Sequence, residues 1–383
     1  MTDRGEQRDS EQQPELRPVT QPADLGAMDA VVPQPERATL VSHDQVAAEV
    51  GQAEVYRGRA HAPATLRAYR SDWAHFTAYC TDRGAAPLPA DPLVVRTYLA
   101  TCADRLGLKV ATLRRRLAAI AHAHAEAGHQ LDTTDAAFRA TWRGIRRTHG
   151  VAQAAKAPVV TEVVKAMLDA LPDTPALVRD RALLLVGFAG GFRRSELCAL
   201  DVADLQWEPD GVRILVRQSK TDQEGAGMIK ALPYAPTPDH CPARALRAWL
   251  DQADIEVGPI FRPVSKTGTV LPRRLTDQWV ALTVKRALAP VAHAQAERAW
   301  ERRSSTQQAR EDRAVWIAAY VARMTRRYAG HSLRAGFVTS AAAAGARVDE
   351  IMDQTGQKDV KTVMRYVRNA RSVRASAAAK LGL

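Results

Sequence analysis

Two short runs of this chain each carry an arginine and a second functional side chain three residues apart. Arg193 stands three residues before Glu196, and His331 stands three residues before Arg334. Residues at this spacing share one face of a helix, so we expect the members of each pair to act together. A guanidinium can grip two phosphate oxygens in a fork, which lysine cannot do, and the Glu196 carboxylate could hold such a fork in place from behind.

Tyr366 adds a nucleophile to these pairs. A free tyrosine has a pKa of about 10, so about one molecule in a thousand is phenolate at pH 7, and forming the phenolate there costs roughly 4 kcal/mol. Neighbouring cations, or a base such as His331, can offset that cost. With Lys220 in a predicted turn, the set contains the parts needed to cut a DNA strand without metal or water.

Each of these features has an ordinary structural interpretation when it is taken singly. An Arg-x-x-Glu pair is more often a surface salt bridge, a helical histidine is usually packed or solvated, and a tyrosine on an amphipathic helix is a core residue by default. Few enzymatic reactions require two arginines, a lysine, a histidine and a tyrosine at one site. Their joint occurrence is therefore what favours strand transfer at a phosphodiester.

The balance of charge indicates a polyanionic partner. The chain has 383 residues, a formal net charge of +12 and a pI near 9.8. Uncompensated Lys and Arg destabilise a compact fold unless something neutralises them, and nucleic acid or an anionic membrane could do so. No apolar run approaches the roughly 18–20 residues that a membrane span needs, and the polar N-terminal residues show no signal-peptide core. Nucleic acid is therefore favoured.

The cysteines carry no predicted function. Cys80, Cys102, Cys198 and Cys241 are widely spaced and form no C-x-x-C pair, so a zinc site is not expected. Cys198 lies in an apolar run and is predicted to be a buried thiol. Free thiols fit a reducing compartment, and we expect a cytoplasmic, nucleoid-associated protein.

The composition divides the chain into a tail and two domains, because 383 residues are too many for one ordinary core. Residues 1–60 are rich in Gln, Glu, Pro and Asp and are predicted to be largely disordered, with a short helix around 43–54 left open. Residues 61–150 have helical periodicity. Residues 151–158 resemble an extended interdomain linker, and residues 159–383 form the second domain.

Four helices are predicted in the first domain, beginning near Pro63, Pro92, Val110 and Asp135. The acidic residues that usually interleave with basic ones on a surface helix are scarce there. We therefore predict that its arginines contact DNA phosphates, with a solvated basic face as the alternative. The candidate DNA-binding residues are Arg67, Arg70, Arg114, Arg115, Arg116, Arg143, Arg146 and Arg147.

The second domain combines helices with a small antiparallel sheet. Alternating, β-branched segments at 212–217 and 226–234 predict two strands, with Lys220 at the turn between them. The charged stretch 290–330 is helical in character, and an apolar stripe there is expected either to pack on its own domain or to contact another protomer. That stripe consists of Val315, Trp316, Ala319, Tyr320 and Met324. Further helices are predicted at 161–171, 178–190, 241–252, 273–288, 332–345, 348–355 and 361–367, with an Ala-rich end at 374–381.

Five motifs in this order resemble the tyrosine recombinase, or phage-type integrase, family, with the Cre-like branch as the nearer match. They are Thr-Leu-Arg-Ala-Tyr-Arg, Gly-Phe-Arg-Arg-Ser-Glu-Leu, Ser-Lys-Thr in a hairpin, His-Ser-Leu-Arg-Ala-Gly, and Gly-Gln-Lys-Asp-Val-Lys-Thr-Val-Met-Arg-Tyr. The likeness covers roughly residues 62–383. It implies a mainly α fold with a small antiparallel β-sheet, made of a helical SAM-like core-binding domain and an α+β tyrosine-recombinase catalytic domain.

The resemblance also implies roles for the arginines and the glutamate. Arg193 and Arg334 would hold the non-bridging oxygens of the scissile phosphate, and Glu196 would buttress the site. Arg193 is preferred to Arg194 because the family arginine follows Gly-x directly and precedes the glutamate by three residues.

The remaining roles follow in the same way. Lys220 would give a proton to the departing 5′ oxygen, and His331 would assist proton transfer at the nucleophile. Tyr366 would form a 3′-phosphotyrosyl link that preserves bond energy, so that rejoining needs no ATP. Gln357 departs from the pattern, because the family usually has His or Trp nine residues before the tyrosine; a glutamine amide can still donate a hydrogen bond to the phosphate.

By resemblance, the chain is expected to be a site-specific DNA recombinase that exchanges strands through a Holliday junction, with no metal or nucleotide cofactor. Four protomers would assemble on double-stranded DNA with inverted repeats, and the tail after Tyr366 would place its terminal helix in a neighbouring protomer. Two alternatives stay open. A type IB topoisomerase would use the same chemistry to relax supercoils as a monomer, and a DNA-binding regulator would have lost the chemistry.

Overall fold

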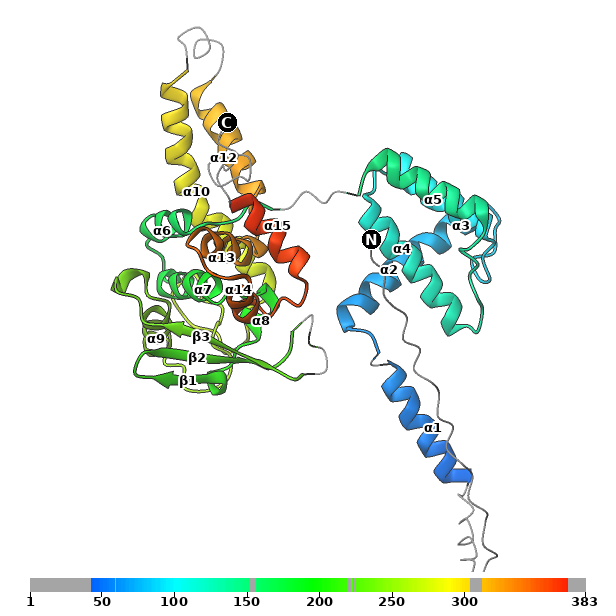
Figure 1. The fold of residues 1–383 in the computed structure, drawn as a ribbon, viewed down its shortest axis with the longest axis horizontal. Helices are drawn as coiled ribbons and strands as arrows, with labels where there is room; N and C mark the ends of the chain where they lie inside the picture. Colours follow the sequence, from blue (N-terminus) through cyan, green and yellow to red (C-terminus); the bar gives the residue numbers. More distant parts are fainter. Residues whose placement is uncertain are drawn as a thin grey trace, which may run out of the picture. The chain divides into compact units, whose positions relative to one another are not determined.

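The computed structural model describes residues 43–58, 60–151, 156–219, 222, 225–303 and 312–370. The chain divides into two units, residues 1–152 and residues 153–383. Both units are built mainly of helices, and the second adds a three-stranded antiparallel sheet (Figure 1). The predicted fold class, mainly α with a small antiparallel β-sheet, is confirmed. The division of the chain falls inside the predicted linker at 151–158.

The first unit is a bundle of helices with well-formed starts. The Asp91 carboxylate accepts a hydrogen bond from Leu93 N at 2.7 Å, and the Asp135 carboxylate accepts one from Phe138 N at 2.8 Å, so both aspartates cap the helices that follow them. Apolar side chains from the last four helices form one core. The helices are α1 (His43–Gly58), α2 (Pro63–Thr81), α3 (Pro92–Asp104), α4 (Val110–Glu126) and α5 (Ala136–His149), and the four predicted starts are confirmed.

Helix α1 lies inside the segment predicted to be largely disordered. It covers the short helix that the sequence leaves open at 43–54 and continues to Gly58. Residues 1–42 and 59 of that tail lie outside the described residues.

The second unit carries the sheet and most of the helices. Several boundaries fall within a few residues of those predicted, and helix α14 matches its prediction at both ends. The helices are α6 (Thr161–Asp169), α7 (Leu177–Ala189), α8 (Arg194–Ala199), α9 (Pro242–Gln252), α10 (Asp277–Glu301), α12 (Arg313–Arg326), α13 (His331–Ala343), α14 (Val348–Thr355) and α15 (Val360–Ala370), with short 3-10 turns at Val202–Asp204 and Pro238–His240. The strands are β1 (Leu205–Glu208), β2 (Gly211–Val216) and β3 (Met228–Pro233).

The sheet has the strand order β1-β2-β3, and both neighbouring pairs are antiparallel. Strand β2 alternates as a half-buried strand should, with Val212, Ile214 and Val216 facing the core. The two strands predicted from the sequence are β2 and β3, and the predicted Lys220 turn between them lies outside the described residues. Strand β1 is missed because four residues are too few to show a period.

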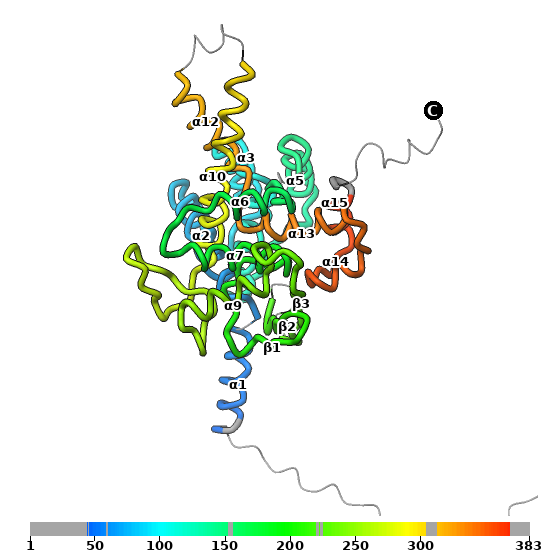
Figure 2. The backbone as a smooth tube through the Cα atoms, turned by 90° about the vertical axis from the view of Figure 1, so that its left-hand side faces the viewer, coloured from blue at the N-terminus to red at the C-terminus, as the bar shows by residue number. Residues whose placement is uncertain are grey.

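The core of the second unit is built around α7, whose residues 182–186 are buried. Helices α6, α9, α10 and α13 pack against it, and α9 also packs on β3 (Figure 2). Cys198 belongs to this core, as predicted, and burial raises the pKa of its thiol to about 12. Among the described residues, no helix is long and apolar enough to span a membrane.

Helix α13 packs closely against the backbone at the start of the second unit, and the closest approach is at Gly336. A Cβ built at Gly336 would lie 1.8 Å from the Val159 carbonyl oxygen, and Val159 N donates a hydrogen bond to Ser332 O at 2.9 Å. The backbone before α6 is therefore fixed against α13, the helix that carries His331 and Arg334.

Replacing Gly336 with alanine is expected to lower the free energy of unfolding by about 2–3 kcal/mol, because the two backbones must move apart to admit a methyl group. Urea denaturation measures this. Gly144→Ala is the matched control, since a Cβ there meets nothing within 4 Å and alanine favours a helix, so that variant should be as stable as wild type or more stable. Equal urea midpoints for Gly336→Ala and wild type would show that the close approach is not real.

Helices α10 and α12 lie side by side and extend away from the sheet (Figures 1 and 2). Two predictions are corrected here. Helix α10 does not end near residue 288 but continues through Pro290 to Glu301. The buried face of α12 centres on Ile317, not on the predicted stripe, in which Val315 is 69% exposed and Ala319 is exposed too. The stripe is correct only in part: the half-buried Trp316 lies against Trp300 of α10, with ring centroids 5.5 Å apart, whereas the most buried side chain of α12 is Ile317.

Candidate active site

Arg193 and Glu196 form the first part of the site. Arg193 precedes α8 and has an extended backbone, with φ −71° and ψ 151°, so the expectation that the two residues share a helical face is wrong. They meet through the helix cap instead. The Glu196 carboxylate accepts from Arg193 N at 2.9 Å and from Arg193 Nη1 at 2.5 Å. Glu196 is 2% exposed, so a buried carboxylate fixes the guanidinium at the edge of the site.

Arg194 takes a different direction from its neighbour. Its guanidinium lies 3.6 Å from the Asp277 carboxylate at the start of α10, and its side chain runs over Gly330. The geometry therefore distinguishes the two consecutive arginines, and Arg193 is the one beside the buried glutamate.

Helix α13 supplies the second pair. His331 opens the helix and Arg334 follows one turn later, as the spacing predicts. Arg334 is 2% exposed, and its Nη1 donates to Gly191 O at 2.7 Å and lies 4.0 Å from Glu196 Oε2. Its Nη2 is buried without a hydrogen-bond partner among the described residues. An unsatisfied buried guanidinium nitrogen is costly, and a phosphate oxygen is the kind of acceptor that would satisfy it.

The cations at this site lie close enough to affect one another. Burial, and then the charge of Arg193, lower the pKa of Arg334 to about 10, while Glu196 and Tyr366 act in the opposite direction. Arg334 still carries its proton at neutral pH. One buried carboxylate faces several positive groups here, so the site attracts an anion.

Tyr366 reaches this cluster from α15. Its Oη lies 3.3 Å from His331 Nε2, so α13 and α15 meet at these two side chains. Partial desolvation of the ring lowers the pKa of His331, and the charges of four arginines lower it further, although the residue as a whole is exposed. The lowered pKa favours the neutral form of His331, and a neutral imidazole nitrogen can accept the phenol proton. The four arginines are Arg334, Arg193, Arg194 and Arg365.

Gln357 lies just beyond the end of α14. The helix ends at Gly356, whose backbone is left-handed with φ 64°, and the chain then turns. Thr355 Oγ1 donates to Gln357 Oε1 at 3.2 Å, which leaves the amide NH2 group of Gln357 as the end that could donate to a phosphate. Lys220, the remaining catalytic candidate, lies outside the described residues.

The structure adds one charged residue that the motifs do not indicate. Lys230 of β3 is 0% exposed, and its Nζ donates to Gly190 O at 2.8 Å and to Gln354 O at 2.5 Å. Burial is the main cause that lowers its pKa to about 7; Glu196 raises it, and Arg334 and Arg193 lower it. A signal was present in the sequence, because the strand alternation places Lys230 on the inner face with Leu232.

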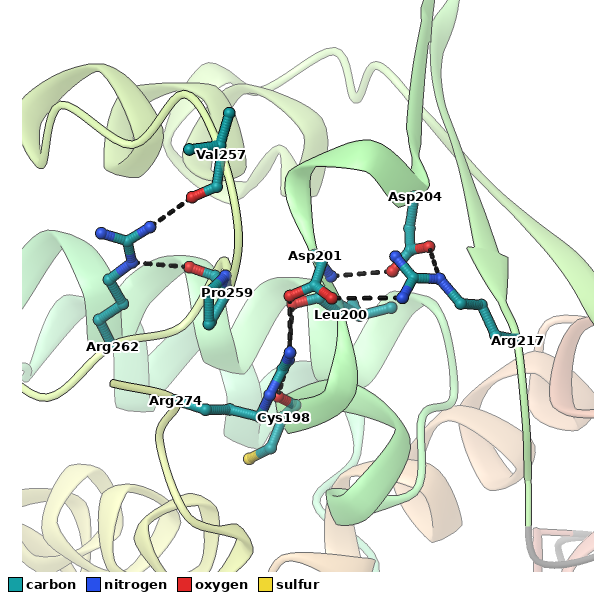
Figure 3. A network of polar contacts seen from close by, with 9 residues as sticks. All are labelled: Cys198, Leu200, Asp201, Asp204, Arg217, Val257, Pro259, Arg262 and Arg274. Carbon is teal, nitrogen blue, oxygen red and sulfur yellow. Dashed lines mark hydrogen bonds and ion pairs between the residues drawn. The ribbon is translucent and has the colours of Figure 1, made fainter. Parts of the chain in front are cut away.

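A polar network holds α8 to the base of the hairpin (Figure 3). Arg217, directly after β2, donates from Nε to Asp204 at 2.6 Å. Arg274 donates to Asp201 at 2.6 Å and to the carbonyls of Cys198 and Leu200 at 2.8 and 3.1 Å. Arg217 Nη1 also donates to Asp201 at 3.3 Å, so Asp201 joins the end of α8, through Arg274, to the residue that follows β2.

Of the predicted DNA-binding arginines of the first unit, seven are exposed and one, Arg116, is half-buried. Arg115 is exposed and forms a double hydrogen bond with Asp72 at 2.7 and 3.1 Å. Arg116 is turned inward and donates to Tyr98 Oη at 2.9 Å and to Cys102 Sγ at 3.0 Å. The Arg116 guanidinium is thus hydrogen-bonded inside the bundle and is not among the arginines available to DNA. The other six are exposed: Arg67, Arg70, Arg114, Arg143, Arg146 and Arg147.

The sequence matches two family models. Residues 159–372 match the model described as the phage integrase family. Residues 53–130 match the model described as the phage integrase N-terminal SAM-like domain.

Individual relatives agree with these matches. An integrase/recombinase xerD homolog of Selenomonas ruminantium is 37% identical over 307 residues, which span 79% of this chain and 81% of the relative. A tyrosine recombinase XerC of Mycobacterium leprae (strain TN) is 30% identical over 237 residues, 60% of this chain and 73% of that one. Among solved structures, the Tn1549 transposon integrase in complex with transposon right end DNA has the same fold, with a TM-score of 0.53 at 13% identity over 86% of this chain and 96% of that chain.

Proposed function

The chain belongs to the phage integrase family, and on this premise we propose that it is a site-specific DNA recombinase that cuts and rejoins strands through Tyr366. The observation that carries the proposal is the meeting of three separate elements. Tyr366 of α15 contacts His331 of α13, and the same helix holds Arg334 beside the Arg193–Glu196 pair. Placement in the Cre-like branch stays a prediction.

The arrangement supports an in-line displacement at phosphorus. Arg193 and Arg334 would hold the two non-bridging oxygens, and binding there would give Arg334 Nη2 its missing acceptor. Neutral His331 would take the phenol proton as the Tyr366 oxygen attacks. One phosphorus–oxygen bond forms to tyrosine while the bond to the 5′ oxygen breaks, and Lys220 would give that oxygen its proton.

The reverse reaction joins the strand to a new partner. A free 5′ hydroxyl from the second DNA site would attack the phosphotyrosyl bond, and Tyr366 would leave with a proton returned to it. The number and kind of bonds are unchanged, so no nucleotide is consumed. Two such exchanges, made one pair of strands at a time, pass through a Holliday junction.

The proposed partner is double-stranded DNA with inverted repeats, bound by a homotetramer in the cytoplasm at the nucleoid. Exposed arginines of the first unit would contact backbone phosphates and fix the register of the protein on the duplex. Affinity should therefore fall steeply with salt, with a log–log slope of about −0.9 for each phosphate neutralised.

A suicide substrate tests the proposal. A duplex taken from the inverted repeats beside the gene and nicked just 3′ of the scissile phosphate loses, after cleavage, the short fragment that bears the new 5′ hydroxyl. A covalent protein–DNA species should therefore accumulate and retain a label placed at the 5′ end of the cleaved strand. Specific binding without any covalent species would favour the non-catalytic regulator. Relaxation of a plasmid that lacks the repeats would favour a type IB topoisomerase.

Gln357 gives a prediction at the position that departs from the family pattern. Replacing it with histidine should leave suicide-substrate cleavage unchanged or raise it by up to about tenfold, because an imidazole can donate to the same phosphate oxygen. Single-turnover cleavage rates of the two proteins measure the effect. A tenfold loss in Gln357→His would show that the glutamine has a role of its own.

A further inference from the structure

Three segments of the second unit meet at one buried lysine. Lys230 of β3 donates to Gly190 O, at the end of α7, and to Gln354 O, in the last turn of α14. The Gln354 side chain closes the same junction, since its Nε2 donates to Ala189 O at 3.2 Å and to Ala231 O at 3.0 Å. Four hydrogen bonds therefore hold the strand and the two helix ends together.

Each helix end in this junction leads directly to a candidate catalytic residue. Gly190 precedes Arg193 by three residues, and Gly191 between them accepts the Arg334 hydrogen bond. On the other side, Gln354 precedes Gln357 by three residues. One lysine is thus the shared donor to the two turns from which Arg193 and Gln357 extend.

The two turns also pack closely against each other. Gly191 has a left-handed backbone with φ 54°, and a Cβ there would lie 3.0 Å from Thr355 Cγ2. The space is small enough that a shift of either turn would carry the other with it. Phe192 covers the lysine, with its ring centroid 4.8 Å from Nζ.

Because Lys230 is charged, a contribution to stability alone is a poor explanation for a lysine at this buried position. The residue is 0% exposed, and of the charged groups that act on it only Glu196 favours its ammonium, while Arg193 and Arg334 oppose it. The acids of α14, which are Asp349, Glu350 and Asp353, are exposed. An apolar residue of similar volume at this inward position would avoid the cost of burying a charge.

We propose that Lys230 is a positioning residue for strand cleavage, which sets the separation of the Arg193 turn and the Gln357 turn by holding the carbonyls of Gly190 and Gln354. The proposal rests on the proposed function. Lys230 does not touch the DNA, because it is fully buried. Its effect on the reaction therefore passes through the two turns.

The test compares three variants with wild type. Lys230→Met keeps an unbranched side chain, one atom shorter than that of lysine, and removes the donors. Gln354→Met removes the other two hydrogen bonds of the junction and changes no charge. Lys285→Met is the matched control, because Lys285 is an exposed lysine of α10. Single-turnover cleavage of the suicide substrate is measured at saturating protein, and DNA affinity and the urea midpoint are measured for each protein.

Lys230→Met should slow cleavage about 100-fold with DNA affinity within threefold of wild type, and Gln354→Met should slow it about tenfold with the same unchanged affinity. Lys285→Met should match wild type in all three measurements. A cleavage rate within threefold of wild type in folded Lys230→Met would overturn the proposal. If that variant does not fold, wild-type cleavage by Gln354→Met would overturn it instead.

A pH titration of stability checks that the lysine is buried as described. The pKa of Lys230 is lowered to about 7 in the folded protein from the ordinary 10.5, so between these values the unfolded chain holds the proton more tightly. Wild-type stability should therefore rise with pH across this window, and Lys230→Met should lack that component. Absence of cleavage by wild type would count against the proposed function itself, whereas cleavage by wild type and Lys230→Met alike counts only against the role of Lys230.

Discussion

Replacing Tyr366 with phenylalanine is expected to reduce strand cleavage by at least about 10⁴-fold, because the attacking oxygen is the one atom removed. The ring itself packs beside the cluster formed by Val338, Ile351, Val363 and Val367, and phenylalanine keeps that packing. DNA affinity should stay within about threefold of wild type. The measurement is covalent capture of the suicide substrate on a denaturing gel, with binding followed in parallel by gel shift.

Tyr320→Phe provides the control for this experiment. Tyr320 is a half-buried tyrosine of α12, outside the site, so its variant should cleave at the wild-type rate. Recombination at the wild-type level by the Tyr366→Phe protein would refute the assignment of the nucleophile. The His331–Tyr366 contact would then be a structural hydrogen bond between two helices.

Replacing Arg334 with lysine is expected to lower the cleavage rate by about 10²–10³-fold with little change in stability. Lysine keeps the positive charge and can still reach Gly191 O, but it has no fork for a second acceptor. The lost contact is the one that Nη2 would make with a phosphate oxygen that gains charge in the transition state. Saturating single-turnover rates isolate this step from binding.

The matched control is Arg179→Lys, since Arg179 is also 2% exposed and has its own carboxylate partner, Asp180, at 2.6 Å. Both substitutions alter a buried arginine of the second unit, so they should disturb the fold to a similar extent. Arg179→Lys is expected to cleave at nearly the wild-type rate. An equal loss in the two variants would mean that Arg334 acts through the fold and not on the phosphate.

The order of the motifs was enough to predict that five side chains meet, but not how they meet; the five are Arg193, Glu196, His331, Arg334 and Tyr366. The spacing of His331 and Arg334 gives the correct geometry because both residues lie on one helix. The same spacing fails for Arg193 and Glu196, where the chain is extended at the arginine and the contact is a helix cap. A three-residue interval fits both arrangements, and tertiary contacts such as the close approach of Gly191 to Thr355 of α14 are not contained in that interval.

Other features depend on tertiary contacts that a local pattern does not contain. Strand β1 exists because β2 supplies its hydrogen-bond partners, and α10 passes through Pro290 where proline usually ends a helix. The inward face of α12 is fixed by α10, so Ile317 is buried although the apolar stripe predicts other residues. Lys230 escapes motif reasoning because its role depends on two carbonyls that are 40 and 124 residues away in the chain.

The helix that carries Tyr366 is held by an apolar cluster separate from the main core of the second unit. In the part of the chain that the structure describes, this cluster has four buried side chains, contributed by α13, α14 and α15, with partly buried neighbours around them. The four are Val338, Ile351, Val363 and Val367. Detaching so small a set costs less free energy than global unfolding, so backbone amides of α15 should exchange with deuterated solvent before those of α7. We therefore expect α15 to move Tyr366 away from the scissile bond and back to it while the rest of the protein stays bound to DNA.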